Sequence, residues 1–193
     1  GDKVVTGFGC GEPFAIERAL VENYQNYHDV QIVNMLTLGD SPWCRPEMKG
    51  HFTLNCLFAS QSNRKAISLG VSEFTTSHFY EIPDLIKNYI RPRVTIVMVS
   101  PPDEHGYVSF GTTVDYTRGT ADYCDIKIAQ VNKYMPRTFG NSFMHIRDFT
   151  CFVEHDEPLP EVKAVEISDT EMEIGKYCAS LINDGDCLQL GIG

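Results

Sequence analysis

The two ends of this chain carry the same pattern, and this repeat constrains the fold more than any other feature. Residues 1–9 and residues 185–193 each contain a Gly-Asp pair, a short apolar run and a Gly-x-Gly sequence. Each copy predicts a tight turn, a buried strand and a glycine loop at the strand's carboxyl end, where a ligand can approach bare backbone. The repeat indicates a protein of two similar halves. The alternative is coincidence, because Gly-Asp turns before apolar strands are common.

Strand-like and helix-like segments alternate along the chain, which predicts an α/β fold with an open, mostly parallel sheet flanked by helices. Strands are expected at residues 3–6, 30–38, 65–69, 94–99, 106–110 and 126–131, and helices after Pro13 and at residues 82–90 and 168–183. The acidic, proline-rich stretch 156–160 leads into the second half. We therefore expect one domain at residues 1–165 and the truncated start of a second, similar domain at residues 166–193.

Composition excludes several classes of function. The formal charge of −10 repels nucleic acid and anionic membranes, and no apolar run is long enough to span a membrane. The chain shows no signal peptide. The seven cysteines contain no C-x-x-C pair, and the six histidines lack metal-ligand spacing, so we expect no metal site. An odd number of scattered cysteines is typical of a reduced, cytoplasmic protein.

The first glycine loop follows a predicted strand and precedes a predicted helix. It reads Gly7-Phe-Gly-Cys-Gly-Glu-Pro13, and its alternating glycines suggest backbone amides that face a ligand. We take Gly9, Gly11, Glu12 and Pro13 as candidate binding residues. A dinucleotide fingerprint would place the third glycine one position later, and Glu12 would repel a pyrophosphate. An NAD-dependent oxidoreductase and a tight turn without any ligand remain as alternatives.

Two further stretches carry candidate residues. Residues 100–111 include the acidic turn Asp103-Glu104-His105, and residues 130–140 follow the strand predicted at 126–131. The second stretch should lie at the carboxyl edge of the sheet, where open α/β proteins bind ligands. Gln130 and Asn132 share a parity and could face the same side. The alternative for both stretches is hydrogen bonding within a loop. A serine hydrolase is disfavoured because the chain has no Gly-x-Ser-x-Gly sequence.

Taken together, these stretches resemble the acetyl-CoA hydrolase/transferase branch of the class I CoA-transferases, and within it the 4-hydroxybutyrate and butyrate:acetate CoA-transferases. The sequences that carry the resemblance are Pro-Glu-Met-Lys-Gly-His-Phe at 46–52, Ser-Pro-Pro-Asp-Glu-His-Gly-Tyr-Val-Ser-Phe-Gly at 100–111, Ala-Gln-Val-Asn-Lys-Tyr-Met-Pro-Arg-Thr-Phe-Gly at 129–140, and Leu-Gln-Leu-Gly-Ile-Gly at 188–193. They span nearly the whole chain in the expected order. The Pro-Pro and Met-Pro-Arg-Thr blocks are specific, whereas the glycine loops alone are not.

The resemblance implies two similar open α/β domains and a ping-pong transfer of CoA from an acyl-CoA to a small carboxylic acid through a glutamyl-CoA thioester. It places the nucleophilic glutamate beyond Gly193, so this chain has no catalytic residue and should be inactive alone. It implies that Gln189, Gly191 and Gly193 form the glycine loop beside that glutamate and that Gly9–Pro13 face it across the domain cleft. Gln130, Asn132 and Met135 are weaker candidates for the substrate side. Gln130 departs from the family, because many relatives carry a glutamate there.

The resemblance also implies the partners of the chain. These are an acyl-CoA and a short-chain carboxylate as substrates, the second half of the same polypeptide and, in many relatives, further copies in a homo-oligomer. It calls for no additional cofactor. Two alternatives stay open, namely an acetyl-CoA hydrolase, which differs in how well water is excluded, and a non-enzymatic ligand-binding α/β module.

Overall fold

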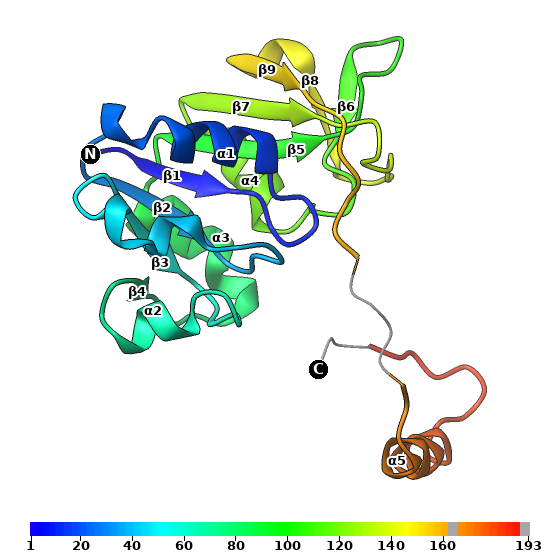
Figure 1. Ribbon diagram of the computed structural model, residues 1–193. Helices are drawn as coiled ribbons and strands as arrows, with labels where there is room; N and C mark the ends of the chain where they lie inside the picture. The colour runs from blue at the N-terminus through cyan, green and yellow to red at the C-terminus, as the bar shows by residue number, and fades with distance from the viewer. Residues whose placement is uncertain (162–165, 190–193) are drawn as a thin grey trace. The chain divides into compact units, whose positions relative to one another are not determined.

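A computed structural model describes residues 1–161 and 166–189 of the chain, which divides into one compact unit at residues 1–160 and a second at 161–193. In the described part, unit 1 holds a seven-stranded sheet in the order β4-β3-β2-β1-β5-β7-β9 (Figure 1). The strands are β1 (Lys3–Thr6), β2 (Val30–Asn34), β3 (Phe52–Cys56), β4 (Glu73–Phe74), β5 (Val94–Val99), β7 (Ile126–Val131) and β9 (Cys151–Glu154). The α/β fold expected from the sequence is confirmed.

Every neighbouring pair in this sheet is parallel, so all seven strands end at the same edge. From β1 the chain builds outward through β2 and β3 to β4, and then returns to place β5 on the other side of β1. The strand order therefore reverses between β1 and β5. In open α/β sheets, ligands bind outside the carboxyl ends of the strands at such a point.

Helices cover both faces of the sheet, as Figure 1 shows, with α1 on one face and α3 and α4 on the other. These helices are α1 (Phe14–Glu22), α3 (Ile82–Leu85), which continues as one π-helical turn at Ile86–Ile90, and α4 (Tyr116–Tyr123). Alternate strand residues pack against opposite helices: Val4 belongs to the core under α1, and Val5 to the core that contains Tyr116. The buried apolar strands are typical of a parallel sheet covered on both faces.

A separate antiparallel ribbon lies beyond the carboxyl end of β5. It pairs β6 (Tyr107–Ser109) with β8 (Phe143–His145), and its Val108 and Met144 pack with Phe110 and Phe149 in a third apolar cluster. The ribbon brings the two most specific sequence blocks close together. Strand β6 lies within residues 100–111, and its partner β8 begins three residues after the block at residues 129–140.

In unit 2, helix α5 (Asp169–Ala179) begins with the predicted capping box, in which the Ser168 hydroxyl accepts a bond from the Glu171 N–H and the Glu171 carboxylate accepts one from the Ser168 N–H. Gly185 adopts a φ of 92° in a turn after the helix. Cys187 and Leu188 are exposed and lie outside any strand, although the repeat predicted a buried strand there. Residues 166–189 contain no strand with which these residues could pair.

Other local predictions differ from the structure. The strand expected at residues 65–69 is wrong, because these residues belong to helix α2 (Arg64–Ser68). The strand expected at 30–38 ends at Asn34, and the helix expected after Pro13 covers Phe14–Glu22. Strands β3, β4, β8 and β9 and helices α2 and α4 were not predicted as such. In the described residues, no helix combines the length and the apolar character needed to cross a bilayer.

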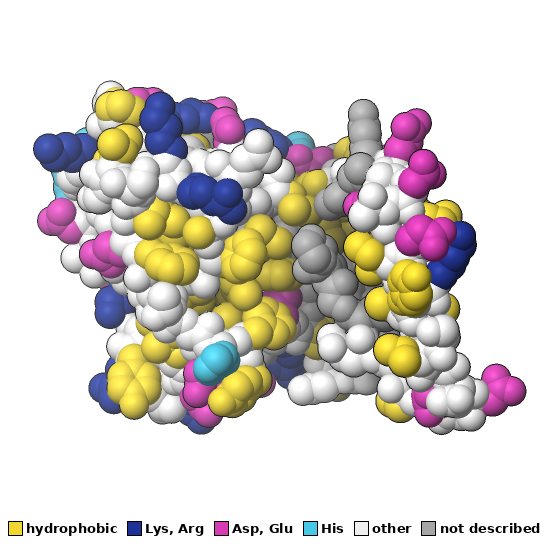
Figure 2. Space-filling model, turned by 90° about the horizontal axis from the view of Figure 1, so that it is seen from below, with side chains coloured by type: hydrophobic (Ala, Val, Ile, Leu, Met, Phe, Trp, Pro, Cys, Tyr) yellow, Lys and Arg dark blue, Asp and Glu magenta, His cyan; other side chains and the backbone are white. Residues whose placement is uncertain are grey.

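The side of unit 1 around β4 exposes large apolar side chains. Figure 2 views the molecule from this side and shows apolar groups gathered on the face. The most exposed members in this part of the chain are Phe58, Leu69, Val71, Phe74, Phe79 and Tyr80. Contiguous apolar surface of this kind is typical of regions that contact other protein.

Candidate functional site

The carboxyl edge of the sheet brings together loops that are far apart in the sequence. The glycine loop after β1 meets the loop after β2 at a backbone bridge between Gly9 and Thr37. It also meets the segment after β6, where the Cys10 Sγ lies 3.3 Å from the Thr112 Oγ1. Thr112 in turn donates its N–H to the Met135 Sδ at 3.5 Å. Loops that follow β1, β6 and β7 therefore meet beside the β1–β5 switch point, and we use the name crevice for this junction of loops, which contains Gly9–Gly11, Thr112 and Met135.

The three glycines of the first loop have different roles. A Cβ on Gly7 would lie 2.3 Å from the Gly11 oxygen, and one on Gly11 would lie 2.4 Å from the Thr113 side chain. Both positions therefore need glycine for close packing. Gly9 has a φ of 56° and would carry a Cβ into open space. Of these three glycines, Gly9 is the one beside which a ligand has room.

Three of the six N–H groups in residues 7–12 bond to the loop itself or to the loop after β2. Gly9 donates to the Leu36 oxygen at 2.8 Å, Gly11 to the Phe8 oxygen at 2.9 Å and Glu12 to the Gly9 oxygen at 3.4 Å. The amides of Gly9, Gly11 and Glu12 are therefore not available to bind a pyrophosphate. The N–H groups of Gly7, Phe8 and Cys10 make no hydrogen bond within residues 1–161 or 166–189, and of these three residues Phe8 and Cys10 are half-buried whereas Gly7 is buried.

Glu12 is buried beneath the crevice, with 1% of its surface exposed. Its Oε1 accepts a bond from the Asn34 Nδ2 at 3.1 Å, and its Oε2 accepts bonds from the Thr37 Oγ1 at 2.8 Å and the Leu38 N–H at 3.3 Å. Burial, with repulsion from Glu17 as a smaller contribution, raises the pKa of Glu12 from 4.5 to about 9. The carboxyl group therefore keeps its proton at neutral pH.

Gln130 and Asn132 are fully buried, and their side chains form hydrogen bonds that connect the carboxyl end of β7 to other segments of the chain. The Gln130 Oε1 accepts the Ala15 N–H at 2.9 Å, and its Nε2 donates to the Glu157 Oε1 at 2.7 Å. The Asn132 Nδ2 donates to the Glu157 oxygen at 2.7 Å, and its Oδ1 accepts the Tyr134 N–H at 3.0 Å. Their polar atoms thus bond to the chain itself, and contact with a substrate stays a prediction for both residues.

The remaining first-half candidates lie at the crevice. Met135 is 2% exposed and contacts Thr112. Pro13 is buried and precedes the first residue of α1. In unit 2, Gln189 is exposed, whereas Gly191 and Gly193 lie outside the described residues. A role for any of these residues in binding CoA or substrate stays a prediction.

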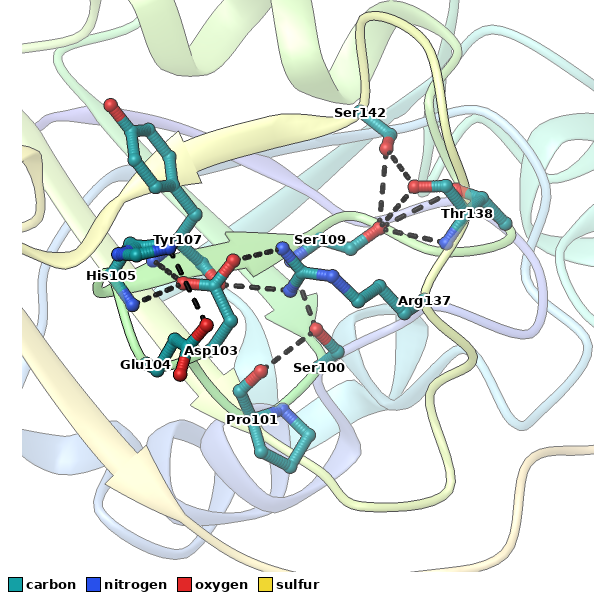
Figure 3. Close-up of polar contacts among 10 residues, drawn as sticks. All are labelled: Ser100, Pro101, Asp103, Glu104, His105, Tyr107, Ser109, Arg137, Thr138 and Ser142. Atoms are coloured by element: carbon teal, nitrogen blue, oxygen red, sulfur yellow. Dashed lines mark hydrogen bonds and ion pairs between the residues drawn. The ribbon is translucent and has the colours of Figure 1, made fainter.

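Hydrogen bonds and an ion pair of Asp103 stabilise the acidic turn at residues 103–105 (Figure 3). Asp103 accepts the N–H groups of His105 and Tyr107 at 3.0 and 2.8 Å and forms an ion pair with Arg137, which also donates to the Tyr107 oxygen at 2.9 Å. These contacts hold the pKa of Asp103 below its usual value, the Tyr107 N–H contributing most. The two specific sequence blocks are thereby joined, as the reading of hydrogen bonding within a loop anticipates.

Ser109 makes the second connection between these blocks. Its buried hydroxyl accepts the N–H groups of Gly111 at 3.1 Å and Thr138 at 3.2 Å, and the Thr138 hydroxyl donates to the Gly111 oxygen at 2.9 Å. Figure 3 shows the Ser109 hydroxyl in contact with both Thr138 and Ser142. This network fixes the turn that presents Thr112 to the crevice.

Sequence reasoning missed several residues of the site: Cys10, Asn34, Thr37, Thr112, Thr113 and Arg137. Asn34 had a usable signal, because it is a polar residue at the end of an apolar strand. The others depend on loop contacts across long sequence separations, which a single sequence does not reveal. Within the described residues, no group of His, Cys, Asp and Glu could hold a metal ion.

Comparisons with known proteins agree with this geometry. Residues 1–163 match the family model of the acetyl-CoA hydrolase/transferase N-terminal domain. The chain is 43% identical to 4-hydroxybutyrate coenzyme A transferase of Clostridium kluyveri, over 99% of the chain and 45% of that protein. It is 29% identical to butyryl-CoA:acetate CoA-transferase of Anaerostipes caccae, over all of the chain and 45% of that protein.

Solved structures give the same result. A 4-hydroxybutyrate CoA-transferase from Porphyromonas gingivalis is 37% identical with a TM-score of 0.83, and RipA from Yersinia pestis is 27% identical with a TM-score of 0.93. All of this chain is covered in both comparisons, against 44% and 47% of the solved chains. The chain thus spans about half the length of the relatives it matches.

Proposed function

Because this chain belongs to the acetyl-CoA hydrolase/transferase family, we propose that the complete polypeptide that contains it transfers coenzyme A between an acyl-CoA and a small carboxylic acid of the acetate, butyrate or 4-hydroxybutyrate type. The observation that carries the proposal is the junction of loops at the β1–β5 switch point, built from the sequence blocks that resemble CoA-transferases. Two relatives that match nearly the whole chain are named 4-hydroxybutyrate coenzyme A transferase and butyryl-CoA:acetate CoA-transferase, which supports acids of this type.

The proposed reaction is a ping-pong exchange. A glutamate carboxylate attacks the thioester carbonyl, the C–S bond breaks and CoA leaves as the thiolate, which gives a mixed anhydride. The thiolate then attacks the glutamyl carbonyl and releases the first carboxylate as a free acid anion, so that CoA is held as a glutamyl thioester. The acceptor carboxylate repeats these steps in reverse and leaves as its CoA thioester. No cofactor beyond the CoA thioester is needed.

We place the nucleophile in the part of the relatives' length that this chain does not span. A nucleophilic carboxylate must be ionised and reach the ligand, whereas Glu12, the acid nearest the crevice loop, is buried and has a raised pKa. The proposed role of residues 1–160 is to form one wall of the site. The free N–H of Cys10 beside the open face of Gly9 supports a hydrogen bond to a ligand oxygen there.

The proposal extends to partners and location. We propose that the apolar face around β4 contributes to contacts within a larger assembly, either with the remainder of the polypeptide or with other copies. The seven cysteines, all within the described residues, are free thiols. This supports a reducing, cytoplasmic environment.

The test uses the complete polypeptide with acetyl-, butyryl- or 4-hydroxybutyryl-CoA, with and without a free acid acceptor. New acyl-CoA that forms only when the acceptor is present, together with a trapped glutamyl-CoA adduct, supports the transferase. Fast release of free CoA without an acceptor supports acetyl-CoA hydrolysis, the second function that the family description names. Binding of acyl-CoA without either reaction indicates a non-enzymatic module, and the 193-residue chain alone should show no turnover.

A further inference from the structure

Two glutamates are buried together where the glycine loop enters helix α1. Glu12 is 1% exposed and Glu17 is 6% exposed. The Glu17 Oε1 has no hydrogen-bond partner in the described part of the chain. Burying a carboxyl group costs free energy unless hydrogen bonds or a charge partner offset the cost. Neither residue is used in the proposed transfer, so their burial calls for another explanation.

The contacts of Glu12 show what it holds in place. Its donors are Asn34 at the end of β2 and Thr37 and Leu38 in the loop that follows. The same two loops meet at the Gly9 N–H, which donates to the Leu36 oxygen at 2.8 Å. The side chain of Glu12 thus fastens residues 7–13 to residues 35–39.

Residues 7–13 and residues 35–39 both border space where a ligand fits, although the Glu12 side chain does not contact that space. Residues 7–13 carry the open face of Gly9 and the free N–H of Cys10. Thr37 and Leu38 line a pocket of about 480 Å³ that residues 58–62 and Arg64 also line. A shift in either loop would therefore move a wall of the proposed site.

The charge of the pair follows from its surroundings. Burial raises the pKa of Glu17 to about 7, against the opposing effects of the Thr6 hydroxyl and of Arg18. From α4, the Tyr116 hydroxyl donates to the Thr6 oxygen at 3.2 Å, and burial raises its own pKa, so it stays neutral. The Glu12–Glu17 pair therefore retains at least one proton at neutral pH.

We propose that Glu12 is a positioning residue for CoA transfer. Its buried carboxyl group holds the loop segment at Gly9–Cys10 and the loop segment at Thr37–Leu38 in fixed positions relative to each other. This inference rests on the proposed function. It assigns Glu12 a role different from the ligand contact predicted by sequence, since the side chain acts through the two loops and does not touch the substrate.

The test compares Glu12→Gln with Thr37→Val in the complete polypeptide, and uses Glu22→Gln, an exposed glutamate at the end of the same helix, as the control. In Glu12→Gln, an amide NH₂ replaces one of the oxygens that accept donors. We expect kcat to fall by about tenfold or more in Glu12→Gln and about threefold in Thr37→Val, with KM changed less than kcat. Glu22→Gln should match the unsubstituted enzyme.

A second readout does not need activity. Hydrogen exchange of the Gly9 amide, which donates to the Leu36 oxygen, should speed up about tenfold in Glu12→Gln and stay unchanged in Glu22→Gln. If the unsubstituted enzyme transfers no CoA, the proposed function fails and this measurement still decides the inference. Gly9 exchange equal to that of the unsubstituted protein, or a Glu12→Gln enzyme with kcat within twofold, would overturn it. Should Glu12→Gln not fold, Thr37→Val decides by the same two measurements.

Discussion

The side-chain oxygen of Gln130, at the carboxyl end of β7, accepts the backbone N–H of Ala15 in the first turn of α1 at 2.9 Å. This bond joins segments 115 residues apart and satisfies one of the N–H groups that a helix leaves free at its start. The other side of the same amide group donates to Glu157. Gln130 therefore connects the first helix, the sheet and the segment after β9.

This arrangement predicts the effect of Gln130→Glu. The new carboxylate would be fully buried and would face the Glu157 carboxylate at the position where the amide now donates at 2.7 Å. We expect the free energy of unfolding at pH 7 to fall by about 2 kcal/mol or more, measured by urea denaturation of the chain. The double variant Gln130→Glu/Glu157→Gln restores a donor and should regain most of the loss. Additive losses would contradict this account.

The buried pair Glu12 and Glu17 predicts how stability depends on pH. Both carboxyl groups have a raised pKa in the folded chain, about 9 and about 7 against 4.5, so the folded state binds more protons than the unfolded state. Their contribution is fully present below pH 4.5 and is lost as the pH rises toward about 9. Stability should fall by roughly 1.4 kcal/mol per pH unit for each retained proton over this range.

Chemical denaturation at a series of pH values between 5 and 9 checks this slope. Glu12→Gln removes one titrating group and should flatten the profile, whereas Glu22→Gln should leave the slope unaltered. A profile that is equally steep in Glu12→Gln would show that other groups cause the dependence.

Two glycines at the crevice should respond differently to alanine. At Gly111 the φ is 60° and a Cβ would lie 2.2 Å from the Met135 Sδ, whereas at Gly9 the φ is 56° and the Cβ would meet open space. We expect Gly9→Ala to cost roughly 1–2 kcal/mol from backbone strain and Gly111→Ala more than about 3 kcal/mol, because overpacking adds to the strain. Thermal and urea unfolding of the two variants provide the comparison. Equal losses would refute the difference in packing.

Arg137 is expected to need its guanidinium group and not only its charge. It pairs with Asp103, donates to the Tyr107 oxygen and lies 4.5 Å from the ring centre of Phe143. Arg137→Lys keeps the charge but loses the fork and the stacking. We expect faster amide exchange at Tyr107 and a loss of about 1 kcal/mol, with Arg147→Lys, an exposed arginine just after β8, as the control. Unchanged exchange at Tyr107 would contradict the prediction.

The sequence was sufficient for the central strands but not for the edges. Val94–Val99 is an uninterrupted apolar run, and its strand was predicted with the observed bounds. Phe52–Cys56 was missed although its alternation of apolar and polar residues is typical of a strand. Residues 65–69 were wrongly read as a strand, since five residues carry too little periodicity to separate a strand from a helical turn.

The candidate site could also be predicted only in part from the sequence. Strand ends located the loops at Gly9 and Met135, because parallel strands finish at one edge. The partners of these loops could not be predicted, since contacts such as Cys10 with Thr112 arise only when the complete sheet forms. Gln130 and Asn132 illustrate the difference: their position was readable, but their hydrogen bonds to Glu157 were not.

The crevice beside β1 and β5 has a consequence for how the chain acquires its shape. Cys10 and Thr112 are separated by 102 positions, and Met135 is synthesised later still. During translation, the first glycine loop cannot contact Thr112 or Met135 until the ribosome has made most of unit 1. Parallel pairing over such distances is slow. We therefore expect the binding surface to form in the last step of folding.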